Sequence, residues 1–292
     1  MANPSLKAFL QKALSLDRRW IFLIVLIVVV VPTIVPLNLP VTVTHEVRDV
    51  YDSIEALPDG SYMFVSFDYE PASTPECDPQ ALALMRHCFQ KKMKVVAVTF
   101  IPQGSGIGER ILNQMKREFD LKYGEDFVWL GYRPGNQAMI IGLTQDLKGT
   151  FRTDVYGTDT TDAARMPILK DVKTLKDFPY LICIHDDSQI DSWVIYANER
   201  IGIKIASACT ALMAAGIYPY YNVGQLTGII GGLKGASEYE KLLKDSAKFQ
   251  GTGINPVGFG TKGMDAQSII HVFVILMIIF GNVAHIALRR LS

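Results

Sequence analysis

The side chains best suited to chemistry follow two apolar runs that have the composition of buried strands. Asp68 ends the run YMFVSFD, and His185 and Asp186 end the run FPYLICIHD. Carboxylates and an imidazole at one edge of a parallel sheet can bind a divalent cation or a polar ligand. A simpler interpretation stays open, because Asp186, Asp187 and Ser188 also precede a predicted helix and can cap it.

A glycine-rich turn follows another apolar run, VVAVTF. Gly104, Gly106 and Gly108 occupy alternate positions and lead into a predicted helix. Backbone N–H groups at such a turn can bind phosphate with help from the helix dipole. The spacing differs from the dinucleotide and P-loop patterns, and Glu109 would repel phosphate. A tight turn that begins a helix explains the same residues, so both interpretations remain.

These residues form one candidate ligand site at the carboxyl ends of the predicted strands. No catalytic residue, metal-ligand set or cofactor is assigned, because the sequence contains no nucleophile elbow, HExxH motif, paired CxxC or kinase signature. The cysteines have neither metal spacing nor a disulfide pattern, and we expect small core residues, in particular at Cys183 and Cys209. The candidate ligand-binding residues are Asp68, Gly104, Gly106, Gly108, His185 and Asp186.

The elements that must position this site alternate regularly along the middle of the chain. Strands that are apolar throughout, each followed by a helix, are typical of right-handed βαβ units in a parallel sheet covered on both faces. The predicted fold is therefore a Rossmann-like three-layer α/β domain over residues 38–267, with the strand order 3-2-1-4-5. The predicted strands cover residues 62–69, 95–100, 127–131, 178–185 and 203–208, and the predicted helices cover 45–57, 78–92, 107–123, 136–149 and 189–200.

Hydrophobic segments flank this domain. Residues 20–37 are almost entirely Ile, Leu, Val and Phe, broken by Pro32, Thr33 and Pro36, and residues 268–288 contain no Lys, Arg, Asp or Glu. A helix that crosses a bilayer needs roughly 20 mostly apolar residues. Both segments are therefore predicted to be transmembrane helices. A cleaved signal peptide is the alternative for the first, although prolines stand where a small-residue cleavage site is expected.

Basic residues beside the two segments predict their orientation. Lys and Arg near the ends of a span favour the cytoplasmic side. We therefore expect cytoplasmic tails at residues 1–19 and 289–292, a two-pass protein of the cell membrane, and a soluble domain outside the cytoplasm. The basic residues in question are Lys7, Lys12, Arg18, Arg19, Arg289 and Arg290.

Residues 211–233 favour a protein partner. They carry no charge and are rich in Gly, Ala and Tyr. This composition is typical of a buried helix or a subunit interface. A third membrane span is disfavoured, because polar residues would lie in its middle. Tyr220, Tyr221 and Ile229 are the interface residues predicted here.

The second hydrophobic segment carries a polar seam, formed by His271, Ile275, Ile278, Asn282 and His285. These residues follow one another in steps of four and three, which places them on one face of a helix. A polar group in hydrocarbon favours contact with another helix, so His271, Asn282 and His285 complete the predicted interface set. Alternatively, the two histidines lie at the headgroup levels.

Three runs of the soluble domain carry a resemblance. They are YDSIEALPDGS, VSFDYEPAS and GQLTGIIGGLKGASEYE, which begin at Tyr51, Val65 and Gly224. They resemble a group of uncharacterised bacterial membrane proteins with terminal transmembrane helices around a Rossmann-like domain. The resemblance covers most of the soluble domain and implies this architecture, but it implies no activity, cofactor or site residue.

The charge balance limits the partners. Lys plus Arg and Asp plus Glu each number 29, so the composition does not indicate a nucleic-acid partner. The expected partners are the lipid bilayer and either further copies of the chain or other membrane subunits. One functional hypothesis is a non-enzymatic subunit of an oligomeric membrane complex, with the soluble domain as an assembly module. The alternative is a membrane-anchored enzyme or ligand sensor that binds a nucleotide, phosphate or metal at the strand ends.

Overall fold

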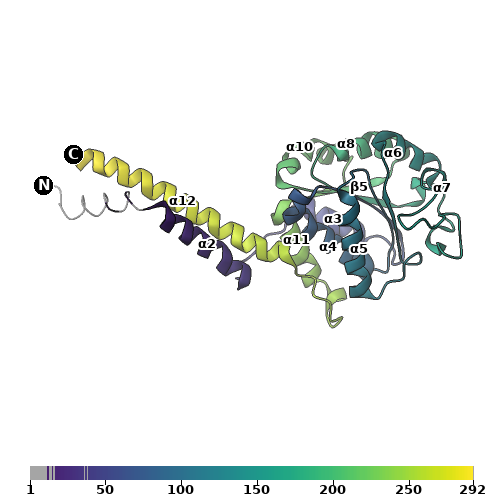
Figure 1. The fold of residues 1–292 in the computed structure, drawn as a ribbon, viewed down its shortest axis with the longest axis horizontal. Helices are drawn as coiled ribbons and strands as arrows, with labels where there is room; N and C mark the ends of the chain where they lie inside the picture. Colours follow the sequence, from purple (N-terminus) through teal and green to yellow (C-terminus); the bar gives the residue numbers. More distant parts are fainter. Residues whose placement is uncertain (1–11, 13–14, 16, 36, 38, 292) are drawn as a thin grey trace. The chain divides into compact units, whose positions relative to one another are not determined.

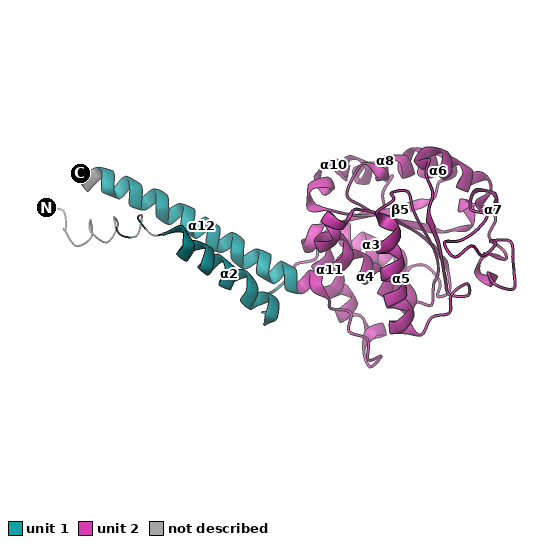
Figure 2. Ribbon diagram, viewed as in Figure 1, with its two compact units in different colours: residues 1–40, 262–292 teal, residues 41–261 magenta. Residues whose placement is uncertain are grey.

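The computed structural model describes residues 12, 15, 17–35, 37 and 39–291 (Figure 1). The chain divides into two compact units (Figure 2), one of residues 41–261 and one of residues 1–40 and 262–292. Lys7 and most of the expected tail at residues 1–19 lie outside the described residues, as does Pro36. The side chain of Arg290 is also outside the description.

The larger unit is built on a six-stranded parallel sheet with the order β3-β2-β1-β4-β5-β6. The predicted α/β class and the predicted order 3-2-1-4-5 are confirmed, and a sixth strand extends the sheet beside β5. The strands are β1 (Tyr62–Asp68), β2 (Lys94–Thr99), β3 (Phe127–Tyr132), β4 (Tyr180–His185), β5 (Lys204–Cys209) and β6 (Gly228–Gly231).

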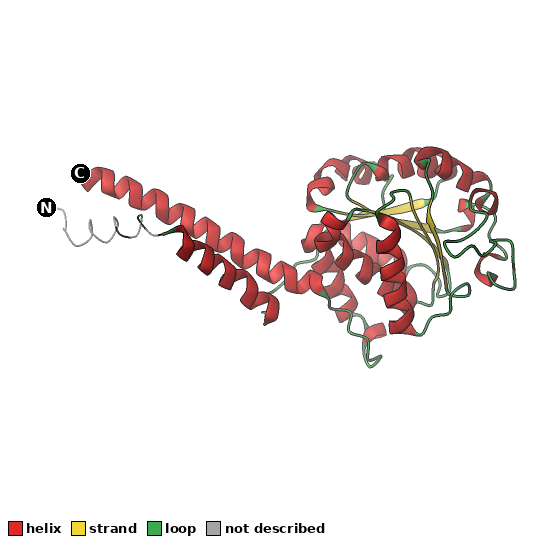
Figure 3. Ribbon diagram, viewed as in Figure 1, coloured by secondary structure: helices red, strands yellow, loops and turns green. Residues whose placement is uncertain are grey.

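Helices cover both faces of the sheet, which gives three layers (Figure 3). One face carries α3 (His45–Glu55), α4 (Thr74–Gln90), α5 (Gly104–Phe119) and α11 (Gly232–Asp245). The opposite face carries α6 (Asn136–Gln145), α7 (Leu147–Thr150), α8 (Gln189–Trp193), the π-helical turn η4 (Val194–Asn198), α9 (Glu199–Ile201) and α10 (Ala211–Asn222). Short 3-10 turns lie at η1 (Pro71–Ser73), η2 (Pro167–Leu169), η3 (Leu175–Asp177) and η5 (Ala247–Phe249).

Several boundaries differ from the sequence prediction. The helix expected at 136–149 is divided, because Asp146 is extended at φ −154° and caps α7 through the Gly149 N–H. Residues 211–233, for which a buried helix or a subunit interface was expected, form α10 followed by β6. Only four residues, GIIG, form β6, so this strand lacks the length from which periodicity identifies a strand.

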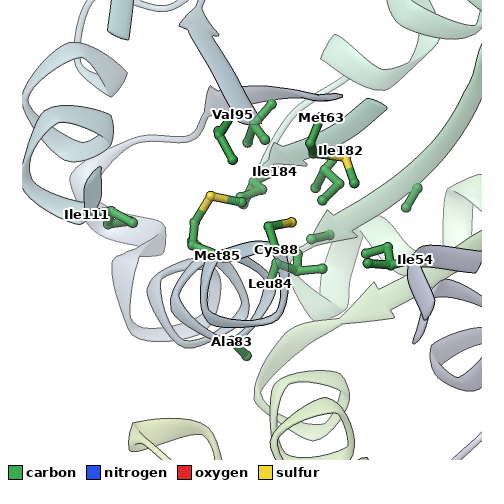
Figure 4. Close-up of a cluster of buried hydrophobic side chains, with 14 of the residues drawn as sticks. Ile54, Met63, Ala83, Leu84, Met85, Cys88, Val95, Ile111, Ile182 and Ile184 are labelled. Carbon is green, nitrogen blue, oxygen red and sulfur yellow. The ribbon is translucent and has the colours of Figure 1, made fainter. Parts of the chain in front are cut away.

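Each face of the sheet has its own apolar core. In the first core, Leu84, Met85 and Cys88 of α4 lie over the strand residues Ile182 and Ile184 (Figure 4). Each such fully buried side chain contributes on the order of 1.5–3 kcal/mol. All four cysteines are buried and free, so the predicted core role of Cys183 and Cys209 is confirmed.

The smaller unit contains α2 (Arg18–Ile34) and most of α12 (Phe259–Leu291). Among the described residues, one helix is long and apolar enough to cross a membrane, over Phe259–Arg289. It includes the whole segment predicted at 268–288. The segment predicted at 20–37 forms a helix of 17 residues, α2, that contains Pro32 and ends at Ile34. The predicted N-terminal transmembrane helix is therefore not among the candidate spans of the described residues, because α2 is too short.

The helices α2 and α12 lie against each other within this unit. Their contact contains an apolar groove, lined by Val28 and Leu39 on one side and by Ile269 and Phe273 of α12 on the other. Asp265 of α12 is buried, and its carboxylate accepts the backbone N–H groups of Leu37 and Leu39 at 2.9 and 3.1 Å. One face of α12 is therefore occupied by the N-terminal part of the chain.

Candidate functional site

The predicted ligand site lies where the direction of the strand order reverses. β1 is flanked by β2 and β4, and Asp68 and His185 are direct neighbours in the register of β1 and β4. Open α/β sheets bind ligands at this kind of switch point, beyond the carboxyl ends of the strands. The fold thus brings these two residues together, and their own contacts decide what they can do.

The Asp68 carboxylate is fully buried and its oxygens are engaged inside the protein. Oδ1 accepts the backbone N–H of Phe100 at 2.7 Å and the Thr99 hydroxyl at 3.3 Å, and the Ser66 hydroxyl donates to Oδ2. Burial raises the pKa of Asp68 to about 6, because desolvation outweighs the hydrogen bonds that favour the charged form. Asp68 therefore ties β1 to the end of β2 and presents no surface to a ligand.

His185 is also fully buried. Its Nδ1 lies 2.7 Å from the carbonyl oxygen of Asp187, and its Nε2 lies 2.8 Å from the Ser207 hydroxyl oxygen. Desolvation lowers the pKa of His185, so the ring is neutral near pH 7. Nδ1–H then donates to the carbonyl and Nε2 accepts from the serine, which leaves neither ring nitrogen for a metal.

The acidic residues after β4 hold loops in place. Asp186 accepts the backbone N–H of Glu70 at 2.9 Å, which joins the loop after β4 to the loop after β1. Asp187 accepts the backbone N–H of Gln189 at 2.8 Å, at the start of α8. The helix-capping interpretation therefore describes Asp187. The N-cap residue Ser188 makes no side-chain capping bond, and Asp186 connects the two strand ends.

The glycines of α5 permit close packing. A Cβ at Gly104 would overlap the carbonyl oxygen of Phe67 and the hydroxyl of Thr99, and one at Gly108 would lie 2.6 Å from the Trp129 ring. A Cβ at Gly106 would enter open space among the described residues. Two of the three glycines are thus explained by the approach of α5 to the sheet.

A hollow of about 200 Å³ lies beside the carboxyl end of β6 and was not predicted. Its polar lining comes from Thr44, Glu46, Tyr218, Lys234 and Glu238. The Tyr218 hydroxyl donates to Glu46 at 2.6 Å, and Lys234 forms an ion pair with Glu238. This mixture of charges can receive a small polar ligand, but each named side chain already has a partner within the domain.

Glu238 and Glu240 are two buried glutamates of α11, and each accepts hydrogen bonds from residues near one end of the α/β domain's sequence. Glu238 accepts the backbone N–H and the hydroxyl of Thr44 at 2.8 and 2.7 Å, just before α3. Glu240 accepts the backbone N–H groups of Gly260 and Thr261 at 3.0 and 2.8 Å, in the first turn of α12. Glu240 thus stabilises N–H groups in the first turn of α12, which are otherwise unpaired, and Glu238 holds the residue that precedes α3.

The helix α10 and its C-cap residue Val223 present an uncharged outer face, which also contains Leu212, Ala215, Gly216 and Pro219. All five are exposed; the Leu212 side chain is 86% exposed and Val223 is 72% exposed. Nothing in the part of the chain that the structure describes covers this face. An uncharged helix face that exposes a large apolar side chain near each end is a candidate interaction surface.

The residues predicted as interface anchors in 211–233 lie elsewhere on these elements. Tyr220 and Tyr221 are half-buried and pack against the second core, and the Tyr221 hydroxyl donates to Asp49. Ile229 is 2% exposed in β6 and belongs to the same core. The exposed surface of this segment therefore comes from the outer face of α10 rather than from these three residues.

The polar seam of α12 lies away from α2. His271, Asn282 and His285 are exposed, and Ile275 and Ile278 are 55% and 57% exposed. At about 100° per residue, the seam is centred roughly 130° around the helix from the residues that line the α2–α12 groove. The Asn282 amide donates to the carbonyl oxygen of Ile278 in the preceding turn at 2.8 Å.

A buried titratable cluster joins α3, α4 and α11. His87 Nδ1 lies 2.7 Å from the Tyr239 hydroxyl oxygen, and Nε2 lies 3.2 Å from Glu55, which also pairs with Lys91 and Lys248. Burial lowers the pKa of His87, while the hydrogen bond from His87 holds the pKa of Glu55 well below its ordinary value. His87 and Tyr239 are both almost inaccessible, so the cluster is structural.

Comparison with protein-family models, curated proteins and solved structures gives no match. Within the described residues, no group of three or more His, Cys, Asp or Glu side chains is arranged to hold a metal ion.

Sequence reasoning missed the hollow and the two glutamates of α11. Thr44 and Glu238 are distant in sequence, and so are Glu240 and Gly260, so no local motif could pair them. One signal was present: Glu238 and Glu240 flank Tyr239 in a helix whose buried face they interrupt. Acidic residues at core-facing positions are rare unless they are paired.

Proposed function

We propose that this protein is a membrane-anchored, non-enzymatic subunit of an oligomeric membrane complex, with the α/β domain as its assembly module. The observation that carries the proposal is the uncharged outer face of α10, where Leu212 and Val223 are 86% and 72% exposed. Burying such a face against a partner is favoured by roughly 25 cal/mol per Å² of apolar surface. No charged group has to be desolvated in return.

The strand ends at the switch point support the same proposal, because their polar groups are used within the fold. Asp68 and His185 are hydrogen-bonded to groups within the fold, and Gly104 and Gly108 are needed for packing. The connection from β1 to α4 contains no glycine and places Glu76 in the first turn of α4. A carboxylate at that position disfavours the phosphate groups that dinucleotide-binding folds receive there.

The membrane arrangement in this proposal has two passes. α12 supplies one span, and α2 supplies the other with a length of about 25 Å at 1.5 Å per residue, close to the hydrocarbon thickness of a thin bilayer. Basic residues beside both segments favour cytoplasmic tails, which leaves the domain outside the cytoplasm. This is also the arrangement that the resemblance to membrane proteins with terminal spans implies.

Labelling in intact cells tests the side. Ala163 is exposed in a turn, and the native cysteines are buried, so Ala163→Cys provides one reactive thiol. An impermeant maleimide should label this variant in intact cells. Labelling only after lysis would place the domain in the cytoplasm.

The alternative function is a ligand sensor, and the hollow beside β6 is the observation that favours it. Glu46, Lys234 and Glu238 line a space of about 200 Å³, and Glu238 also accepts hydrogen bonds from Thr44, just before α3. A small zwitterion or amine would fit these charges. Such a ligand would act by changing the contacts of Thr44 and the segment before α3, without catalysis.

Native mass spectrometry after mild detergent extraction separates the two functions. The assembly function predicts an oligomer of the full chain, alone or with other subunits, without a bound small molecule. A monomer that carries a stoichiometric small molecule would contradict it and support the sensor. Ala214→Leu, which places a larger side chain in the wall of the hollow, should remove such a molecule if the hollow holds it.

A further inference from the structure

We propose that the polar seam of α12 is the contact surface for α12 of a second copy of this chain. The proposal rests on the proposed membrane assembly and names its partner. The seam is defined, as above, by His271, Ile275, Ile278, Asn282 and His285. Its spacing of alternating four and three residues is the spacing by which two helices pack along a shared seam.

The position of Asn282 along α12 supplies the driving force. Residue 278 is the middle of the apolar segment 268–288, so Asn282 lies about 6 Å from the centre at 1.5 Å per residue. The hydrocarbon core extends roughly 15 Å to either side of its centre. The Asn282 carboxamide therefore lies within hydrocarbon, where a polar group is stabilised by contact with another polar group.

The bond that Asn282 makes within its own helix does not satisfy it fully. One amide hydrogen is directed to the Ile278 carbonyl. A carboxamide has a second donor hydrogen and two acceptor positions on its oxygen. A second carboxamide facing the first can use both, because the group is donor and acceptor at once.

The α2 helix leaves this face of α12 open. Its inner residues are Ile21, Val25, Val28 and Pro32, which follow in steps of four, three and four and are less exposed than their neighbours. Val28 lines the groove against Ile269 and Phe273, roughly 130° around α12 from the seam. Within the described residues, nothing from the same chain covers Ile275 or Ile278.

A second copy of this chain matches the seam, because its α12 carries the same residues in the same order. Copies inserted in one membrane share one topology, so their α12 helices run parallel and each residue meets its own counterpart at the same depth. Parallel pairing then places Asn282 opposite Asn282, flanked by Ile278 and His285 of both helices. A buried Asn pair at one seam position is a known means of fixing register and a two-stranded state.

Cysteine cross-linking tests the proposal in membranes of cells that express the full chain. Burial raises the pKa of all the native thiols, so an introduced cysteine in α12 is the reactive one. Ile275→Cys and Ile278→Cys lie on the seam. Leu276→Cys is the matched control, since Leu276 is 59% exposed at nearly the same depth but lines the α2 groove.

Under a copper–phenanthroline oxidant, Ile275→Cys and Ile278→Cys should give disulfide-linked homodimers, and Leu276→Cys should stay monomeric. Equal cross-linking of Leu276→Cys would overturn the proposal, because it would mean random collision. Capture of a different protein by the seam cysteines would overturn it as well, while leaving the assembly function intact.

Asn282→Leu supplies an independent measurement that does not depend on thiol geometry. Interhelical hydrogen bonds in membranes average about 0.6 kcal/mol and reach about 1.7, so dimerisation in detergent should weaken roughly threefold to eighteenfold. Val283→Leu, at a neighbouring exposed apolar position, is the control and should leave the dimer unchanged. An unchanged dimer constant for Asn282→Leu would contradict the seam.

Discussion

The strand ends at the switch point and the outer face of α10 use their residues in opposite ways. At the strand ends, polar groups such as Asp68 and His185 are buried and each is hydrogen-bonded within the fold. On α10, apolar groups such as Leu212 and Val223 are exposed and uncovered within the described residues. The comparison shows that residue type alone does not mark a site, since what matters is whether the fold itself satisfies the group.

The largest effect is expected from filling the space beneath the glycine turn. Gly104→Ala should destabilise the domain by about 1–3 kcal/mol or more, because the added methyl group overlaps the Phe67 carbonyl and the Thr99 hydroxyl. Gly106→Ala should be neutral or stabilising, since its methyl group enters open space and alanine favours a helix. Thermal unfolding of both variants checks this, and equal stability of the two would mean that the turn is not a packing device.

Asp68→Asn should change how stability depends on pH. A folded pKa of about 6 against an ordinary 3.8 means that the folded state resists ionisation of this carboxyl. The resulting penalty is absent below pH 3.8, grows as the pH rises towards 6, and amounts to on the order of 2–3 kcal/mol above that.

The asparagine variant lacks this penalty and keeps an oxygen that can accept the Phe100 N–H. Its unfolding temperature relative to the wild type should therefore rise between pH 4 and pH 7. A difference that stays constant across this range would show that Asp68 does not titrate in the folded protein.

Gly216→Ala should give the smallest change in stability, and this change should differ between the isolated and the assembled chain. Gly216 is exposed on α10 with open space around its Cβ position among the described residues, so alanine should stabilise the isolated chain by up to about 1 kcal/mol. In the assembled protein the gain should shrink, because the methyl group lies on the docking face. The same gain with and without the assembly-blocking change Leu212→Asp would count against α10 as the contact surface.

The regular part of the fold was predictable because its signals are local. Strands such as β1 and β4 are continuous apolar runs, and their switch-point position follows from the order of a doubly wound sheet. The strand β6 was not predicted, because GIIG is short and the residues around it look like one uncharged helical segment. The contacts of Glu238 and Glu240 were not predicted, because Thr44 reaches Glu238 and Gly260 reaches Glu240 only after folding.

At the candidate site, the sequence predicted where the residues lie but not what they contact. Asp68, His185 and Gly104 were predicted to face a ligand, and the sequence does place them at one edge of the sheet. It does not contain the information that Phe100, Ser207 and Phe67 occupy the surrounding space. Satisfaction of a polar group depends on long-range packing, which residue spacing does not encode.

The most direct measurement of the central claim is the mass of the full-length chain in mild detergent, with and without a charge on the outer face of α10. Leu212→Asp should shift the native mass towards smaller assemblies while thermal unfolding remains cooperative. Ile195→Asp is the matched control, because Ile195 is 45% exposed in η4, and it should leave the mass unchanged. An unchanged mass for Leu212→Asp would contradict the assembly role of this domain.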